Sequence, residues 1–381
     1  MMKKTLQTIF LLCAIALLAS CGNGGSGSGG NAFSETGTNE ENSYAKFFKI
    51  THYSNCKVIS VINPWDTTRI LQKYVLVEKD SPLPDKLPQG TIIRTPVENI
   101  IMYSTIHASI WEELGALENV AGICEPEYLT SQNAKQMLTE GKIQDCGMAA
   151  SPNVEKIIEI EGQFIVASPF ENGGYGQAEK LGIPIFESAD YMENHPLGRV
   201  EWMKVFGLLS GREDVADSLF KSTENSYNSL KALAAGAVGK PRIMSERKYG
   251  SSWFIVGGAS YIAQMYKDAG ADYIFSDNPD TGSVPFAFET VFDKGADSDL
   301  WVFKYAAERP MTYADLEAEY SPYARFAPFR NRKIYTCNTV GTPYYEYIAI
   351  HPDYILADYV KMFHPHLLPD YEPVCYLPMP E

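Results

Sequence analysis

Hydrophobic and polar residues first show regular periods at residue 47. Two apolar runs, 47–62 and 69–77, flank the turn Asn63-Pro64-Trp65-Asp66 and predict β-strands. Prolines at 82, 84 and 88 then interrupt the pattern. Beyond Pro96, short apolar runs alternate with helical periods, which predicts a mostly parallel sheet covered by helices. The predicted strands of this block are 97–103, 120–124, 164–168 and 183–186, and its predicted helices are 108–117, 154–160 and 175–181.

A long amphipathic segment at 198–235 separates this block from a second one. Its apolar residues recur every three or four positions, as on one face of a helix, and Gly207 and Gly211 are positions where that helix could bend. The second block has predicted strands at 242–246, 300–304 and 333–337 and predicted helices at 261–269, from 288, at 313–320 and at 354–363. The fold predicted from these patterns is α/β, with two Rossmann-like lobes joined by one long helix and a ligand cleft between the lobes.

The first 46 residues follow a different pattern, that of an export signal and a tether. Lys3 and Lys4 precede an apolar run at 9–18 that is too short to cross a bilayer comfortably. The sequence Leu18-Ala19-Ser20-Cys21 resembles the bacterial lipoprotein cleavage motif, which implies that Cys21 becomes the lipidated first residue. An ordinary secretory signal with an incidental cysteine is the alternative. The glycine-rich segment that follows cannot form a stable helix or strand, and such a tether spans roughly 25–30 Å.

Composition narrows the choice of partners. The chain is 45% hydrophobic, carries a net charge of −15 and has a pI near 4.9, which argues against nucleic acid or anionic lipid as partners. About 330 residues after the tether suit two domains. The predicted divisions are a signal peptide at 1–20, a tether at 21–46, an N-terminal lobe at 47–197 with an extra β region at 47–95, a linking helix at 198–236 and a C-terminal lobe at 237–381.

Five cysteines remain once Cys13 leaves with the signal and Cys21 carries lipid. An exported protein can keep disulfides, and an odd number leaves at least one thiol free or paired elsewhere. Cys124 and Cys146 are the favoured pair, because both are expected in loops at strand ends.

Several local motifs, taken in order, carry a family resemblance. They are Pro152-Asn153-Val154-Glu155-Lys156-Ile157-Ile158, Leu181-Gly182-Ile183-Pro184-Ile185-Phe186, Gly207-Leu208-Leu209-Ser210-Gly211-Arg212-Glu213, Phe288-Glu289-Thr290-Val291 and Arg332-Lys333-Ile334-Tyr335. From Pro96 to about Phe363 the chain resembles the substrate-binding lipoproteins of ABC importers for iron–siderophores, haem and vitamin B12, which are class III periplasmic binding proteins. The region before Pro96 is not covered by this resemblance.

The resemblance implies a receptor that performs no chemistry and needs no cofactor or resident metal. In that family a rigid helix joins the lobes, and one glutamate on each lobe pairs with arginines of the permease. Matched by motif, these glutamates are Glu155 and Glu289. A carboxylate in the first turn of a helix is favoured by the helix dipole and could steer docking. Two solvated glutamates without such a role are the alternative.

The resemblance also implies partners and a place. The partners are an ABC permease with its ATPase and a small metal chelate or corrinoid, the chain being held in the periplasm by its lipid anchor. A tether of this kind raises the receptor's effective concentration at the permease.

Ligand contacts in such proteins come from loops that follow the strands. Aromatic side chains there can stack on a flat ligand, and arginine can pair with an anionic chelate. The predicted contacts are Tyr103, Thr105, His107, Asn172, Tyr175, Arg247, Trp253, Tyr305 and Tyr345, within a wider set that includes Glu125, Tyr128, Tyr249 and Tyr344. His107 could ligate a metal or haem, although a single histidine is more often structural. Loop tyrosines that only cap a core edge are the alternative for the others.

Motifs of the common enzyme classes are missing from the sequence. The GGYG loop at 173–176 does not complete a dinucleotide fingerprint, because Glu179 stands where the last glycine belongs. There is no Gly-x-Ser-x-Gly elbow and no His-Glu-x-x-His zinc motif. Two other function classes stay open: a lipoprotein hydrolase that acts on glycans through two carboxylates, and a scaffold lipoprotein without catalysis.

Overall fold

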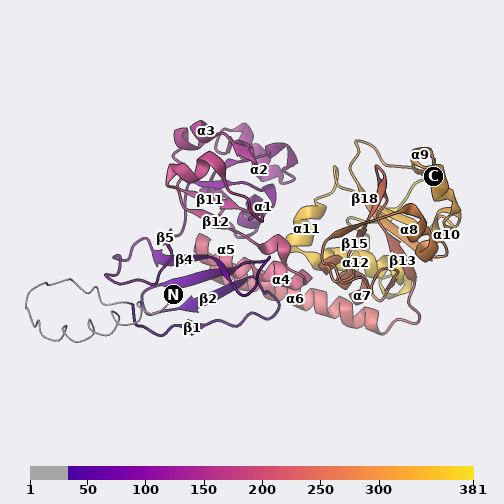
Figure 1. The fold of residues 1–381 in the computed structure, drawn as a ribbon, viewed down its shortest axis with the longest axis horizontal. Helices are drawn as coiled ribbons and strands as arrows, with labels where there is room; N and C mark the ends of the chain where they lie inside the picture. The colour runs from indigo at the N-terminus through magenta and orange to yellow at the C-terminus, as the bar shows by residue number, and fades with distance from the viewer. Residues whose placement is uncertain (1–32) are drawn as a thin grey trace, which may run out of the picture. The chain divides into compact units, whose positions relative to one another are not determined.

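The computed structural model describes residues 33–381 (Figure 1). The predictions for the export signal, for Cys21 and for the tether up to residue 32 therefore lie outside the described residues. From residue 33 onward, no helix is both long enough and apolar enough to cross a membrane.

The extra β region is a five-stranded sheet in the order β1-β2-β3-β4-β5. It starts earlier than predicted, because β1 lies inside the segment 21–46 that was expected to be a tether. Its first four strands are antiparallel, and β5 joins β4 in parallel. The strands are β1 Thr38–Asn39, β2 Phe48–His52, β3 Lys57–Ile62, β4 Ile70–Glu78 and β5 Thr91–Thr95. The predicted run 47–62 is thus a hairpin, because the polar turn between β2 and β3 closes with a hydrogen bond from the Tyr53 N–H to the Cys56 carbonyl (2.9 Å).

The N-terminal lobe contains a wholly parallel sheet in the order β12-β11-β6-β7-β8. This confirms the parallel arrangement predicted from the alternating pattern. Its strands are β6 Ile100–Met102, β7 Val120–Ile123, β8 Gln144–Asp145, β11 Phe164–Ala167 and β12 Ile185–Glu187. Its helices are α1 Thr105–Glu113, α2 Gln132–Thr139 and α3 Val154–Glu159, and a small hairpin joins β9 Gly147–Met148 to β10 Ser151–Pro152. The helix predicted at 175–181 is a 3-10 helix, Gly176–Leu181.

The predicted linking helix consists of three helical segments. They are α4 Pro196–Glu201, α5 Met203–Ser210 and α6 Glu213–Ala235. Gly211 ends α5 because it takes a left-handed backbone conformation with φ +68°, which glycine adopts without a steric penalty. The bend that the sequence indicated at Gly211 is therefore a complete break, and only α6 is long.

The C-terminal lobe has a five-stranded sheet in the order β16-β13-β18-β19-β20, in which only β20 is antiparallel. A second, antiparallel sheet, β14-β15-β17, was not predicted. The strands are β13 Arg242–Ser245, β14 Lys248–Tyr249, β15 Ser252–Val256, β16 Asp272–Tyr273, β17 Ser283–Phe286, β18 Leu300–Tyr305, β19 Ile334–Asn338 and β20 Leu377–Pro378. The helices are α7 Tyr261–Asp268, α8 Phe288–Gly295, α9 Tyr313–Glu319, α10 Ala327–Arg330, α11 Tyr344–Ile350 and α12 Pro352–Phe363.

Each lobe has its own large hydrophobic core. The N-terminal core contains Trp111 and Trp202, and the C-terminal core contains Trp253 and Trp301. Tyr44, which precedes β2, packs against both cores. The two cores meet along the helical segments between the lobes, and residues Glu35–Glu381 form one compact unit.

Candidate functional site: a pocket between the two lobes

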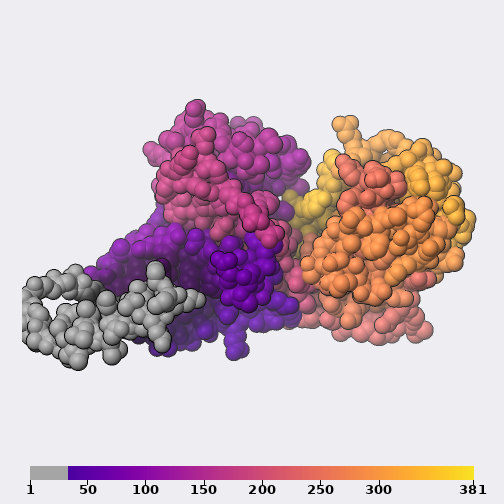
Figure 2. Space-filling model, viewed as in Figure 1, coloured from indigo at the N-terminus to yellow at the C-terminus, as the bar shows by residue number. Residues whose placement is uncertain are grey.

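Loops from both lobes enclose a cavity of about 620 Å³, which we call the aromatic pocket. Figure 2 shows the surface hollowed between the two lobes. Most of its lining follows the carboxyl ends of parallel strands, where ligands bind in open α/β sheets. The N-terminal lobe contributes the loop after β12, and the C-terminal lobe contributes the segments after β13 and β19. The lining residues are Tyr191, Met192, Glu193, Asn194, Glu246, Arg247, Lys248, Tyr249, Phe254, Val256, Ser260, Tyr261, Ile262, Thr281, Gly282, Ser283, Lys304, Tyr344 and Tyr345.

Six aromatic rings line this pocket, and several are unusually exposed. Tyr249 is 81% exposed, Tyr345 is 51% exposed and Phe254 is 41% exposed. Large exposed rings in a concave site are characteristic of surfaces that bind another molecule. These rings offer flat apolar faces on which a planar ligand could stack.

Basic side chains line the pocket although the chain as a whole carries a net charge of −15. Lys304 Nζ lies 2.5 Å from the Glu246 carboxylate and 5.5 Å from the centre of the Tyr344 ring. Burial alone would lower the pKa of Lys304, but the charge of Glu246 raises it well above its usual value. The pocket therefore holds an ion pair beside its aromatic rings.

Glu246 adopts a left-handed backbone conformation with φ +58°, which is uncommon for a residue other than glycine. Strained backbone of this kind concentrates at functional sites. Its neighbour Arg247 pairs with Glu319, and the Arg247 Nε is buried without a partner. Lys248 lies over the Tyr320 ring at 4.9 Å and donates to the Gly250 carbonyl (2.7 Å).

A second cavity of about 620 Å³ lies elsewhere between the lobes, and we call it the acidic pocket. Glu112 and Glu113 of α1 face Glu346 and His351 of the C-terminal lobe across it. The Thr130 hydroxyl donates to the buried Glu346 (2.8 Å), and this hydrogen bond joins the two lobes. The hydrogen bond to His351 lowers the pKa of Glu113 below its usual range. This cavity has fewer aromatic residues and more carboxylates than the aromatic pocket.

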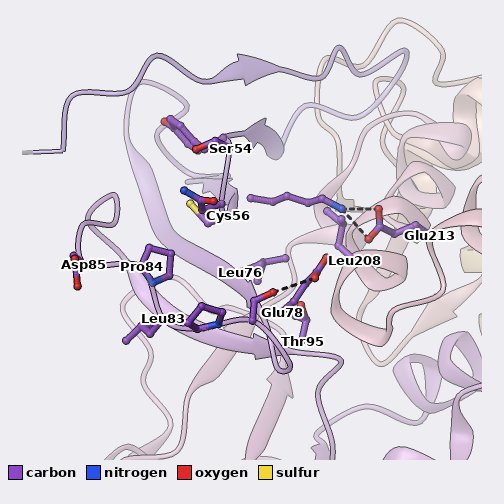
Figure 3. Close-up of a pocket in the computed structure, with 15 residues that line it drawn as sticks. Ser54, Cys56, Leu76, Glu78, Leu83, Pro84, Asp85, Thr95, Leu208 and Glu213 are labelled. Carbon is purple, nitrogen blue, oxygen red and sulfur yellow. Dashed lines mark hydrogen bonds and ion pairs between the residues drawn. The ribbon is translucent and has the colours of Figure 1, made fainter.

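A third cavity, of about 630 Å³, lies away from the cleft in the extra β region (Figure 3). Residues of the β2–β3 turn and the proline-rich loop Pro82-Leu83-Pro84 line it. Lys57 at its edge pairs with Glu213 of α6 (2.6 Å). The buried Cys56 also lines it.

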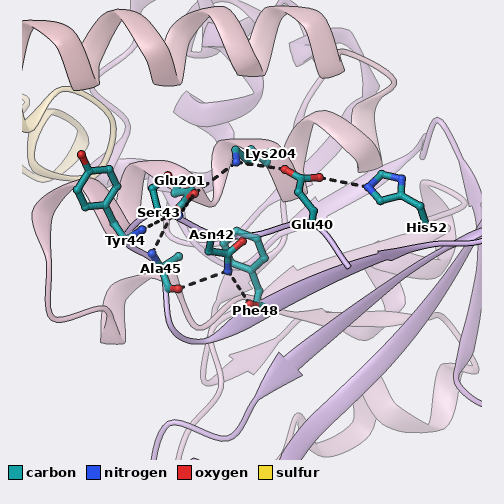
Figure 4. Close-up of polar contacts among 9 residues, drawn as sticks. All are labelled: Glu40, Asn42, Ser43, Tyr44, Ala45, Phe48, His52, Glu201 and Lys204. Atoms are coloured by element: carbon teal, nitrogen blue, oxygen red, sulfur yellow. Dashed lines mark hydrogen bonds and ion pairs between the residues drawn. The ribbon is translucent and has the colours of Figure 1, made fainter. Parts of the chain in front are cut away.

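A segment at 42–47, which we call the strap, is fixed to the inter-lobe helices by two buried carboxylates. Backbone N–H groups of Ser43, Tyr44 and Ala45 each donate to Glu201 at 2.8 Å (Figure 4). The next two N–H groups of the strap donate to Glu193, which also lines the aromatic pocket. The strap therefore connects the start of the folded chain to one wall of the pocket.

The structure divides the predicted ligand contacts into two groups. Arg247 and Tyr345 line the aromatic pocket, as do Tyr249 and Tyr344 of the wider set. The others do not line either pocket between the lobes: Tyr103, Thr105, His107, Asn172, Tyr175, Trp253 and Tyr305.

His107 belongs to a buried polar cluster and is not available to a ligand. It is 2% exposed, and its Nε2 lies 3.1 Å from Asp190 Oδ1. Asp190 also accepts from Ser188 (2.7 Å) and from Arg199 (3.2 Å). Burial alone would raise the pKa of Asp190, but the His107 hydrogen bond and the Arg199 charge lower it below its usual range.

Trp253 and Tyr305 are likewise core residues. Trp253 is fully buried, and its ring stacks on Trp301 at 5.5 Å. It was predicted as a contact because β15 was not recognised; its neighbour Phe254 points into the pocket instead. The Tyr305 hydroxyl is used locally, since it accepts from the Met311 N–H (2.9 Å).

Tyr103 and Tyr175 pack together at the end of the N-terminal sheet, with ring centroids 6.2 Å apart. The Tyr175 hydroxyl donates to Glu187 (3.1 Å), whereas the Tyr103 hydroxyl is buried without a partner. Thr105 is buried at the start of α1, and Asn172 is exposed in a loop.

The predicted disulfide between Cys124 and Cys146 is not formed in the structure. Both thiols are free, and each points at a carbonyl oxygen: Cys124 Sγ at that of Cys146 (3.9 Å) and Cys146 Sγ at that of Gln144 (3.8 Å). The two residues do follow neighbouring strands, as the sequence indicated, but no bond joins their sulfur atoms.

Glu155 and Glu289 are each the second residue of a helix, one in each lobe. Each is exposed in the first turn of a helix, α3 and α8 respectively. Neither has an ion pair among the described residues.

Sequence reasoning missed several residues of the aromatic pocket, among them Tyr191, Phe254, Tyr261 and Lys304. Lys304 stands within the predicted strand 300–304, where a charged residue near the carboxyl end of an apolar run was the available signal. Among the described residues, no group of three or more His, Cys, Asp or Glu side chains is arranged to hold a metal ion.

Comparison with known proteins gives the family. Residues 100–359 match the periplasmic binding protein family. An uncharacterized lipoprotein of Methanocaldococcus jannaschii is 27% identical over 347 residues, covering 84% of this chain and 81% of the relative.

Two solved structures show the same fold at low identity. IsdE of S. aureus, solved with haem, has a TM-score of 0.54 at 13% identity and covers 70% of this chain and 99% of its own. The molybdate-binding MolA of Haemophilus influenzae has a TM-score of 0.54 at 13% identity and covers 73% and 89%. The two-lobe fold predicted from the sequence is confirmed, and the chain belongs to the periplasmic binding protein family.

Proposed function

We propose that this protein captures a chelated metal compound in the aromatic pocket and delivers it to an ABC permease. An iron–siderophore is the first candidate, followed by a corrinoid and by haem. The observation that carries the proposal is the joint lining of this pocket by exposed aromatic rings and basic side chains.

The chemistry of the pocket supports this class of ligand. Tyr249, Tyr345 and Phe254 can stack on an aromatic chelator, and Arg247 and Lys248 can attract its negative charge. A volume of about 620 Å³ lies within the usual range for small-molecule sites. The acidic pocket has the opposite charge and suits an anionic chelate less well.

We further propose that Glu155 and Glu289 dock the receptor on its permease. Both are exposed, one on each lobe, and both are fixed in direction by the first turn of a helix. We also propose that Cys21 anchors the chain outside the cytoplasm, in keeping with the periplasmic family and the lipoprotein relative.

A titration of the purified protein tests the ligand proposal. Tryptophan fluorescence and absorbance are followed while ferric catecholate and hydroxamate siderophores, haem, cyanocobalamin and cobinamide are added in turn. Trp253 should report binding through its fluorescence, because it directly precedes Phe254 in β15 and Phe254 lines the pocket. Saturation by one class at or below micromolar concentration supports the proposal. No binding by any class contradicts it, and turnover of a glycan substrate would favour the hydrolase alternative.

A further inference from the structure

Two buried cysteines meet in the C-terminal lobe, outside the ligand pocket. Cys337 is near the end of β19, and Cys375 lies just before β20. The last pair of the antiparallel ladder, Thr336 with Leu377, stands one residue from Cys337 and two from Cys375. Both side chains belong to the same hydrophobic core.

Both are free thiols in the structure. Interaction with the neighbouring Cys337 thiol, together with burial, raises the pKa of Cys375. Cys124 and Cys146 differ in this respect, because each of their thiols points at a carbonyl oxygen. Cys56 lies in the extra β region.

The backbone around Cys375 is fixed independently of its thiol. The buried carboxylate of Asp358 accepts hydrogen bonds from the N–H groups of Val374 (2.9 Å), Cys375 (2.7 Å) and Tyr376 (2.8 Å). Three hydrogen bonds to one buried carboxylate therefore hold the backbone on both sides of Cys375 in place.

We propose that Cys337 and Cys375 form a disulfide in the exported protein. One S–S bond forms as two S–H bonds break. The two protons and two electrons pass to the disulfide of an extracytoplasmic thiol–disulfide oxidoreductase, which leaves as a dithiol. Proteins exported from the cytoplasm retain such bonds, and this chain belongs to a periplasmic family.

The bond would close a covalent loop around α11 and α12. Tyr344 and Tyr345 at the start of α11 line the aromatic pocket, while Glu346 and His351 line the acidic pocket. The disulfide would thus join the two ends of the segment that contains α11, which lies between the two cavities. This role does not depend on the identity of the ligand.

Peptide mapping of the exported protein tests the proposal. The full chain is produced with its own leader in a bacterial host with an oxidising periplasm and extracted from membranes in detergent. Free thiols are blocked with N-ethylmaleimide in denaturant before digestion without reductant. The matched control is the chain that starts after residue 20, kept in the reducing cytoplasm.

We expect a peptide pair joined through Cys337 and Cys375 in the exported protein and both cysteines alkylated in the control. Cys56, Cys124 and Cys146 should be alkylated in both samples. Alkylation of Cys337 and Cys375 in the exported protein overturns the proposal, as does a bond from either of them to another cysteine.

A thermal measurement adds a readout that peptide mapping does not give. Reductant should lower the melting temperature of the exported protein by several degrees and leave that of the Cys337→Ala/Cys375→Ala variant unchanged. An equal response of both proteins to reductant contradicts a structural disulfide at this position.

Discussion

Buried carboxylates organise the segment between the lobes at the scale of single residues. Asp190, Glu193 and Glu201 are each almost fully buried, and each accepts several hydrogen bonds. A buried charge persists only when it is paired or hydrogen-bonded, so each of these side chains fixes the groups that surround it. They hold the β12 loop and the strap against the inter-lobe helices.

Asp190→Asn should make stability depend less on pH. The pKa of Asp190 is lowered in the folded state, so its carboxylate stabilises the fold above the unfolded value near pH 4 and loses that effect as pH falls further. At pH 7 the substitution leaves Arg199 buried without its partner and should cost about 3 kcal/mol of unfolding free energy.

Urea unfolding at pH 7 and at pH 3 checks this. The stability difference between wild type and variant should shrink at the lower pH. A difference that stays constant between the two pH values would show that the carboxylate's charge is not what stabilises this cluster.

Among the secondary-structure elements, the strap holds the first sheet against α4. Glu201→Ala removes the acceptor for three consecutive N–H groups and should lower the free energy of unfolding by about 3 kcal/mol. Glu213→Ala is the control, because Glu213 is half-exposed and its ion pair with Lys57 should contribute less than about 1 kcal/mol. Equal losses of unfolding free energy in the Glu201→Ala and Glu213→Ala variants, measured in urea, would show that the strap does not hold the sheet in place.

The break between α5 and α6 depends on Gly211. An alanine there would be strained by the positive φ, and its Cβ would lie 2.9 Å from the Pro96 ring. Gly211→Ala should therefore destabilise the protein by about 1–2 kcal/mol. Gly236→Ala, at the end of α6 with φ −83°, should be nearly neutral. If both variants melt at the wild-type temperature, the left-handed turn is not required.

Helices and strands with a clear periodicity of apolar residues were predictable from the sequence, and short or strained elements were not. The strand at Val120–Ile123 and the helix from Phe288 are close to their predicted positions because their apolar periods are continuous. The sheet β14-β15-β17 was missed because its three strands are short and separated by turns. Trp253 was assigned to the ligand for the same reason, since alternation along β15 decides which side chain faces the pocket.

For the whole molecule, the order of the sequence motifs was enough to predict the family. It was not enough to predict which residues line the pocket. A sequence shows which loops follow strands, yet it does not show which side chains of those loops converge. Tyr345 and Tyr305 both follow predicted strands, and only the structure separates the exposed ring from the buried one.

Docking on a permease would involve both lobes, through Glu155 and Glu289. The Glu155→Lys/Glu289→Lys variant should abolish uptake of the ligand by cells while its affinity for the ligand stays unchanged. The control is Glu159→Lys/Asp293→Lys, which changes the net charge equally on exposed positions of the same helices. The measurement is the uptake of radiolabelled ligand by cells that carry either double variant. Transport that survives in the Glu155→Lys/Glu289→Lys cells would show that these glutamates do not dock.

The affinity of the aromatic pocket for a metal chelate decides whether this protein is a receptor for such compounds. Wild type, Tyr345→Ala and Tyr354→Ala are each titrated with the panel of siderophores, corrinoids and haem. Tyr345 lines the pocket and Tyr354 does not, although the two are similarly exposed, at 51% and 41%. We predict that one class of compound binds wild type, that Tyr345→Ala weakens this binding about tenfold (~1.4 kcal/mol), and that Tyr354→Ala leaves the affinity unchanged. Equal affinity of wild type and Tyr345→Ala, or no binding by any compound, would contradict it.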